Sequence, residues 1–306
     1  MEDVSLAAFW LALAATALSV AGYWSELLGV RLVIRRLATD AGEGPVVATF
    51  DQTEATSLSE PTGQLARAAT WAAAAMFVLW AAARWQAVGH APWSNMYEFT
   101  VAFGGAMTLF CVAFERLYRP DEDRRPAAVL GALILPVVFA LLVIAAAFFP
   151  SEIHPLVPAL QNSDLLAIHV ATMVLAYGAL SLSFAAAVLY LAKAKTNRFA
   201  RLPKARTLDD LAYRSVMVGF PLLALGIALG AYWANHAWGR YWGWDPKETS
   251  ALVTWLIYGV YLHMRGLRNW RGSRSAWVLV GGFGAVMFTY FAVNLWVSGL
   301  HSYAGV

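Results

Sequence analysis

Cysteine is almost absent from this sequence, and its scarcity excludes several kinds of membrane protein. Cys111 is the only cysteine among 306 residues, so no disulfide forms within the chain. Without a C-x-x-C pair the protein is not a membrane thiol reductant, and without C-x-x-C-H it does not carry covalent haem c itself. Functions that need paired thiols in this chain are therefore excluded.

Charged residues are scarce as well. They make up 13% of the chain against 60% hydrophobic residues, and the mean hydropathy is +0.56. A soluble domain carries about a quarter of its residues charged. Apolar runs of about 18 residues or more recur, each long enough to cross the ~30 Å hydrocarbon layer of a bilayer. The first run follows Met1-Glu2-Asp3 with no basic n-region or cleavage site, which predicts a retained helix rather than a signal peptide.

These runs predict an all-α, polytopic membrane protein with about eight transmembrane helices. We place the helices at residues 5–29, 65–86, 97–117, 127–149, 164–192, 212–233, 247–265 and 276–298. Of the 22 lysine and arginine residues, all but Arg84, Arg240 and Lys247 fall on one face of this topology. The positive-inside rule then puts the basic connections in the cytoplasm and both termini on the outer, extracytoplasmic side. Because the basic residues follow the topology, nucleic acid is not an expected partner.

The domain organisation is expected to be simple. We find no internal repeat of the kind that inverted-repeat transporters show, so we predict a single transmembrane domain over residues 1–306. Segment 38–64 is polar and contains several glycines and prolines, which predicts a flexible cytoplasmic loop. A second, aromatic loop is expected on the outer side at about residues 232–248.

Most of the six histidines fall near the outer face of this topology. His90, His154, His236 and His301 lie in outer loops or just past a helix end, and His169 lies ~8 Å below the outer end of its helix. Any one of them alone is at least as well explained as an interfacial side chain. As a set they point to haem, because imidazole is a common axial ligand of haem iron.

Depth in the membrane limits which histidines can bind the same iron. Two axial imidazoles on one iron lie ~4 Å apart. His169 and His301 are both near the outer ends of their helices and can meet. His263 lies ~25 Å from the outer side, so it cannot share an iron with either of them. No helix carries two widely spaced histidines, as the stacked haems of a respiratory cytochrome b require.

The densest local signal is the outer aromatic segment, residues 232–248. Tryptophan and tyrosine are far more frequent there than an interfacial aromatic belt explains, and Gly239 and Gly243 permit close backbone approach to a flat macrocycle. Arg240 and Lys247 are positioned to meet haem propionates, although Lys247 is equally well explained as a surface cation. Asp245 opens a helix as an N-cap followed by proline and by Glu248 as a capping box, a structural role that is compatible with function.

These residues resemble a known family. The sequence WGRYWGWDPKE at 238–248 is similar to the tryptophan-rich WWD signature of the haem-handling proteins, and within them to the CcsA (ResC) branch of cytochrome c biogenesis. Three further segments fit that branch: PWSNMYE at 92–98, PLVPALQ at 155–161 leading to His169, and the final His301. The likeness covers the chain from about the second helix onward. It departs from the usual signature at Tyr241, where tryptophan is common.

The resemblance implies roles for individual residues. His169 and His301 would be the outer axial ligands of haem b, beside a surface of Trp238, Tyr241, Trp242, Trp244, Asp245 and Arg240. His263 would be the membrane-embedded histidine whose second iron ligand comes from a partner protein, CcsB (ResB). The other three histidines, His90, His154 and His236, receive no role.

The function implied is system II cytochrome c biogenesis, with this chain as a subunit of a holocytochrome c synthase (haem lyase). Haem b would pass to the extracytoplasmic face of the bacterial plasma membrane and be presented to the C-x-x-C-H thiols of apocytochrome c. A thiol-reducing system would take part indirectly, and the lipid bilayer is the other expected contact.

Two rival functions follow from the same residues. A substrate transporter with an aromatic-lined outer vestibule needs paired charges inside its helices, and the predicted helix interiors show none. A haem protein that only transfers electrons would also bind haem, but it would attach none covalently to an apocytochrome.

Overall fold

The computed structural model describes residues 1–28, 59–117, 125–153, 163–195, 204–267, 270–293 and 296–301. Within these ranges the chain forms helices only. Their bounds are α1 Glu2–Leu28, α2 Ser59–Val88, α3 Met96–Leu117, α4 Arg125–Phe148, α5 Ser163–Lys195, α6 Ala205–Trp238, α7 Pro246–Arg265 and α8 Ser273–Met287, and α8 continues into a π-helix at Phe288–Ala292. The predicted all-α class is confirmed.

Six of these helices, α1 to α6, are long and apolar enough to cross a membrane. α8 has 15 residues before its π-helical extension, and α7 has 20 with a polar first turn. The multi-pass character expected from composition is therefore confirmed. The count of eight spans and the outer position of both termini stay predictions.

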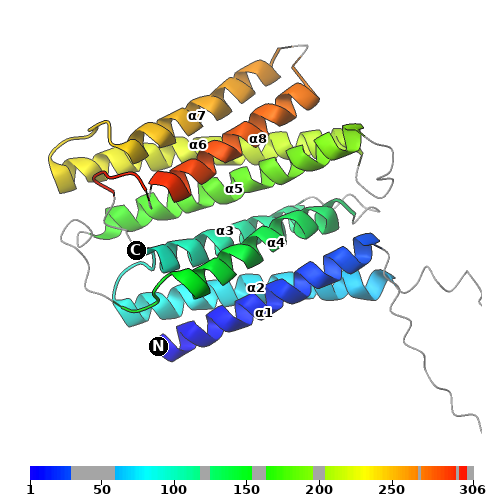
Figure 1. Ribbon diagram of the computed structural model, residues 1–306, viewed down its shortest axis with the longest axis horizontal. Coiled ribbons are helices and arrows are strands. Elements are labelled where there is room, and N and C mark those ends of the chain that lie inside the picture. The colour runs from blue at the N-terminus through cyan, green and yellow to red at the C-terminus, as the bar shows by residue number, and fades with distance from the viewer. Residues whose placement is uncertain are drawn as a thin grey trace, which may run out of the picture.

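Successive helices run antiparallel, side by side (Figure 1). α1 to α4 pack on one another, α5 to α8 form a second group, and α3 and α4 join the groups by packing on α5. The α2–α3 and α6–α7 connections lie at the same end of the bundle as the start of α1 and residues 296–301 (Figure 1). Segments widely separated in sequence therefore meet at this end.

The contact between α5 and α6 is the most extensive in the bundle, and glycines on α6 permit it. A Cβ added at Gly219, Gly226 or Gly230 would lie 2.5–2.8 Å from side-chain atoms of α5. Small residues let helix backbones approach closely inside membranes, where the hydrophobic effect contributes little to helix association. The α6 glycines thus set the position of the α5 side chains that face them, including His169.

Two predicted loops change their bounds. Residues 59–64 of the expected cytoplasmic loop 38–64 form the first turns of α2, and the rest of that loop, up to residue 58, lies outside the described residues. The aromatic segment 232–248 is a loop only at 239–245, because α6 continues to Trp238 and α7 begins at Pro246. Gly239 ends α6 in the left-handed conformation, with φ 73°.

Candidate functional site

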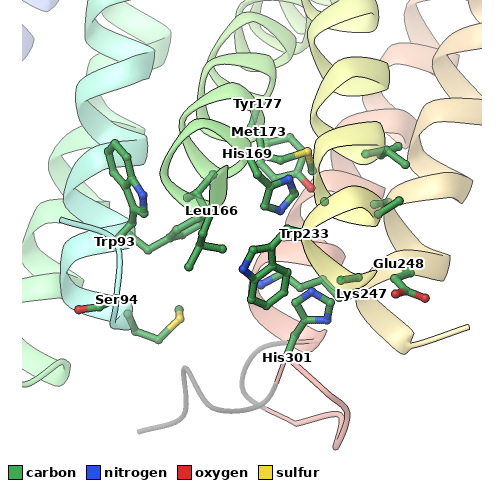
Figure 2. A pocket seen from close by; sticks show the side chains of 18 of the residues that line it. Trp93, Ser94, Leu166, His169, Met173, Tyr177, Trp233, Lys247, Glu248 and His301 are labelled. Atoms are coloured by element: carbon green, nitrogen blue, oxygen red, sulfur yellow. The ribbon is translucent and has the colours of Figure 1, made fainter. Parts of the chain in front are cut away.

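A cavity opens at the end of the bundle where these connections meet. It has about 1050 Å³ of empty space, part of it open to solvent, and it lies among the α2–α3 connection, α3, α5, α6, α7 and His301 (Figure 2). Its lining is mainly apolar and aromatic, and includes Trp93, Phe99, His169, Met173, Tyr177, Trp233, Trp242, Lys247 and His301. Ligand clefts in proteins are mostly apolar with a few polar groups, which is the character of this lining.

His169 projects from α5 into the cavity and is held by α6. Its Nδ1 lies 2.7 Å from the carbonyl oxygen of Gly226. A carbonyl accepts only, so Nδ1 carries the proton and Nε2 keeps a lone pair. A Cβ added at Gly230 would lie 2.6 Å from Cε1 of His169, so the ring rests directly against the α6 backbone.

His301 reaches the same cavity from the segment that follows α8. Its Nδ1 lies 2.6 Å from Oδ2 of Asp245, and the ring of Trp238 packs on it edge-to-face with centroids 5.0 Å apart. Burial lowers the pKa of His301 below its usual value, although the hydrogen bond that its ring donates to Asp245 opposes that shift. The neutral ring with Nδ1 protonated is therefore favoured, and Nε2 is again the nitrogen with a lone pair.

Asp245 combines the structural and the functional role. Its carboxylate accepts from the backbone N–H of Lys247 at 3.0 Å and completes the predicted capping box with Glu248, so the predicted helix start is confirmed. The same carboxylate accepts from the N–H of Leu300 at 2.6 Å and from His301. Burial alone raises the pKa of Asp245, but its hydrogen bond and charge interaction with His301 bring it below the usual value. The first turn of α7 thus fixes the last histidine.

The other residues of the aromatic segment divide into two groups. Trp242 lines the cavity and contacts Trp244 edge-to-face, with ring centroids 5.8 Å apart. Trp244 itself is 70% exposed and has φ 57°, and Tyr241 is also exposed. Arg240 is exposed, and its guanidinium lies over Gly243. The structure therefore places Trp242 in the cavity lining together with both histidines, and Trp238 against His301. Tyr241, Trp244 and Arg240 lie outside the described lining of the cavity.

The remaining histidines are away from the cavity. His263 is exposed in the last turn of α7, ~27 Å along the helix from Asp245, as the depth argument expected. Nδ1 of His236 bonds the carbonyl of Tyr232, and that of His90 bonds the carbonyl of Ala91. His154 lies outside the described residues, as does the 155–161 segment.

Sequence reasoning missed part of the cavity wall. Met173 and Tyr177 lie one and two turns beyond His169 on the same face of α5, a spacing that the sequence displays. Gly226 and Gly230 were missed because nothing in α6 alone says which helix packs on it. The α2–α3 wall, formed by Trp93, Ser94 and Asn95, belongs to a segment that resembles the family in sequence. That resemblance does not indicate that these residues line the same cavity as His169.

The α2–α3 wall is anchored by a buried ion pair. Nε of Arg84 lies 2.8 Å from Oε1 of Glu98, and the other carboxylate oxygen accepts from the N–H and the hydroxyl of Ser94. At the start of α3, Asn95 accepts from the N–H of Glu98, while the Glu98 side chain bonds Arg84 and Ser94. Arg84 also donates to the carbonyl of Ser151, so the pair ties two connections together at the cavity end.

Breaking this ion pair is expected to destabilise the bundle strongly. Glu98→Gln leaves the buried Arg84 charge uncompensated, which costs about 3–5 kcal/mol, and the double variant Arg84→Met/Glu98→Leu is expected to cost less than either single change. Asp210→Asn, in the exposed pair with Arg214, is the matched control, with an expected cost below about 1 kcal/mol. Thermal unfolding in detergent measures all three variants. A Glu98→Gln protein as stable as the control would contradict the prediction.

The chain is similar to a known protein family over most of its length. The profile of a family described as "Cytochrome C assembly protein" matches residues 93–301. A cytochrome c biogenesis protein CcsA of Chlamydomonas reinhardtii is 40% identical over 74% of this chain and 65% of its own length. CcsA of Guillardia theta is 37% identical over 72% of this chain and 79% of its own, and CcsA of Synechococcus elongatus is 35% identical over 72% and 81%. Just under two thirds of the algal protein's length is thus spanned.

A solved structure also shares the fold. The cytochrome c haem lyase CcmF superposes with a TM-score of 0.62 at 19% identity, over 94% of this chain and 46% of CcmF. At that identity the likeness concerns the arrangement of the helices. It agrees with the all-helical bundle described above.

Proposed function

Since this chain belongs to the cytochrome c assembly protein family, with CcsA proteins as its relatives, we propose that it binds haem b in the cavity and presents it to apocytochrome c. Haem is the cargo of this reaction rather than a resident cofactor. Its iron would be bound by His169 and His301, and its macrocycle would lie against Trp233, Trp242 and Phe99. This role goes beyond membership in cytochrome c biogenesis, which the family already establishes.

One observation carries the proposal: two imidazoles from distant parts of the chain line one apolar cavity, each with its Nδ1 held by a hydrogen bond. The Nδ1 groups donate to Gly226 and Asp245, which leaves both Nε2 atoms as lone-pair donors. Histidines that bind metals nearly always have the second ring nitrogen hydrogen-bonded in this way, to a carbonyl or a carboxylate. The apolar and aromatic lining of the cavity also suits a flat, mainly apolar ligand.

The proposed chemistry is the addition of two thiols across two vinyl groups. In each addition a cysteine sulfur of C-x-x-C-H bonds to one vinyl carbon and the thiol proton goes to the other carbon. No group leaves, and no net oxidation occurs. This chain would hold the porphyrin in one orientation while the peptide approaches, and such positioning can remove several kcal/mol from a barrier.

The remaining parts of the function are proposals of the same kind. The cavity end would face the extracytoplasmic side of a bacterial plasma membrane, because most of the basic residues that the structure describes lie toward the other end. His263 is exposed on α7. It would bind iron together with a ligand from a CcsB (ResB) partner. The two chains would form the holocytochrome c synthase, supplied with thiols by a separate reducing system.

The test is an absorption spectrum followed by an attachment assay. Full-length protein, purified with and without the CcsB partner, is expected to carry low-spin haem b. Coexpression with an apocytochrome is expected to yield haem that stays bound to the apocytochrome under denaturing conditions. Haem without covalent attachment would favour the electron-transfer rival. Absence of haem in every preparation would favour the transporter rival.

A further inference from the structure

Lys247 is the residue of the cavity that the proposed iron ligands do not explain. It follows Pro246 in the first turn of α7, lines the cavity, and places Nζ 5.9 Å from the ring centroid of Phe99. Figure 2 shows it beside Trp233 and His301, on the wall formed by α6 and α7. A cation here is unfavourable in two ways, because the first turn of a helix repels positive charge and an apolar cavity hydrates an ammonium poorly.

Two carboxylates lie close to Lys247 in the sequence, Asp245 and Glu248. Asp245 attracts the charge of Lys247, but its two oxygens already accept from the N–H groups of Lys247 and Leu300 and from His301. Glu248 accepts from the backbone N–H groups of Gly243 and Asp245, so its Oε2 is committed to the loop. A cation in the lining would also attract an anionic group of a ligand bound in the cavity.

The sequence offers Arg240 and Lys247 equally as cations that could meet a haem propionate, but the structure places them differently. Arg240 lies on the exposed side of the aromatic loop, over Gly243 and outside the lining of the cavity. Lys247 shares that lining with both His169 and His301. The two cations therefore have different access to a ligand bound between the histidines.

We propose that Lys247 binds a carboxylate of the tetrapyrrole, a haem propionate, by a charge-assisted hydrogen bond. The inference rests on the proposed haem-binding function and deepens it. The propionates and the vinyl groups occupy different pyrrole rings of haem b, so fixing a propionate at α7 fixes which edge of the macrocycle is left for the apocytochrome thiols. Lys247 would then determine the orientation of the macrocycle in the cavity, while the histidines bind its iron.

The experiment compares two probes, haem b and its dimethyl ester, in which both propionates are neutral. The full-length wild type is expected to bind haem about 10- to 100-fold more tightly than the ester. Lys247→Met is expected to lose that preference by weakening haem binding alone, and Lys247→Arg to retain most of it. Arg240→Met tests the rival cation, and Arg271→Met, exposed beyond the other end of α7, is a matched control.

Each outcome decides the inference. It is overturned if wild type binds haem and the ester equally, a comparison that does not depend on the folding of any variant. It is also overturned if Lys247→Met weakens both ligands equally, which would indicate a structural lysine, or if Arg240→Met alone removes the preference. A wild type that binds neither probe would instead refute the proposed function, and the inference with it.

Discussion

Exchanging either His169 or His301 for glycine is expected to remove one iron ligand and convert the bound haem from low spin to high spin or to the unbound form. Each ring is held at Nδ1, which leaves Nε2 as the ring nitrogen with a lone pair. The loss of haem affinity is expected to reach at least the ~10- to 100-fold that removal of an outer hydrogen-bond partner costs. Absorption spectra measure the change.

Free imidazole provides the decisive control for these variants. Glycine leaves a hole of the right shape, so added imidazole is expected to restore the low-spin spectrum and part of the cytochrome c yield. His236→Gly is the matched control, because that ring is exposed and bonds only the carbonyl of Tyr232 among the interactions described. Unchanged spectra in both His169→Gly and His301→Gly would rule out this pair as the axial ligands.

The second large effect is expected from Gly230, a glycine of the cavity wall that lies against His169. In Gly230→Ala the new Cβ would lie 2.6 Å from Cε1 and 3.0 Å from Nδ1 of His169, closer than such atoms approach. The imidazole has to turn away from α6, which breaks its hydrogen bond to Gly226. Haem affinity is expected to fall about 10- to 100-fold, although alanine favours the helix by about 1 kcal/mol.

A glycine in an open environment separates this steric effect from a general effect of alanine. Gly281 lies in α8 with nothing within 4 Å of an added Cβ. Gly281→Ala is therefore expected to leave the spectrum unchanged and to raise the thermal unfolding midpoint slightly. If Gly230→Ala also keeps the wild-type spectrum, His169 does not depend on the α6 backbone for its position.

Much of the helix pattern could be predicted from sequence, because the apolar runs and the start signals agree. The predicted helix at 247–265 is α7, Pro246–Arg265, since Asp245, Pro246 and Glu248 mark its first turn. The predicted helix at 276–298 ends too late. α8 passes into a π-helix at Phe288–Ala292, and apolar periodicity contains no signal for that change of hydrogen bonding.

The candidate site was predictable only to the level of membrane depth and family likeness. Depth brought His169 and His301 to one end of the bundle, and the structure places both in one cavity. The partners of those rings, Gly226 and Asp245, depend on how α5 packs on α6 and how the last residues return to α7. Such contacts between distant segments have no local pattern in the chain.

The three hydrogen bonds of Asp245 have a consequence for the order in which the protein is made. The α6–α7 loop and His169 emerge from the ribosome well before His301, and Asp245 cannot fix that histidine until residues 300 and 301 exist. A growing chain therefore lacks the second imidazole of the cavity until residue 301 has been synthesised. On the proposed function, capture of haem by two histidines would thus be reserved for protein whose synthesis has passed His301.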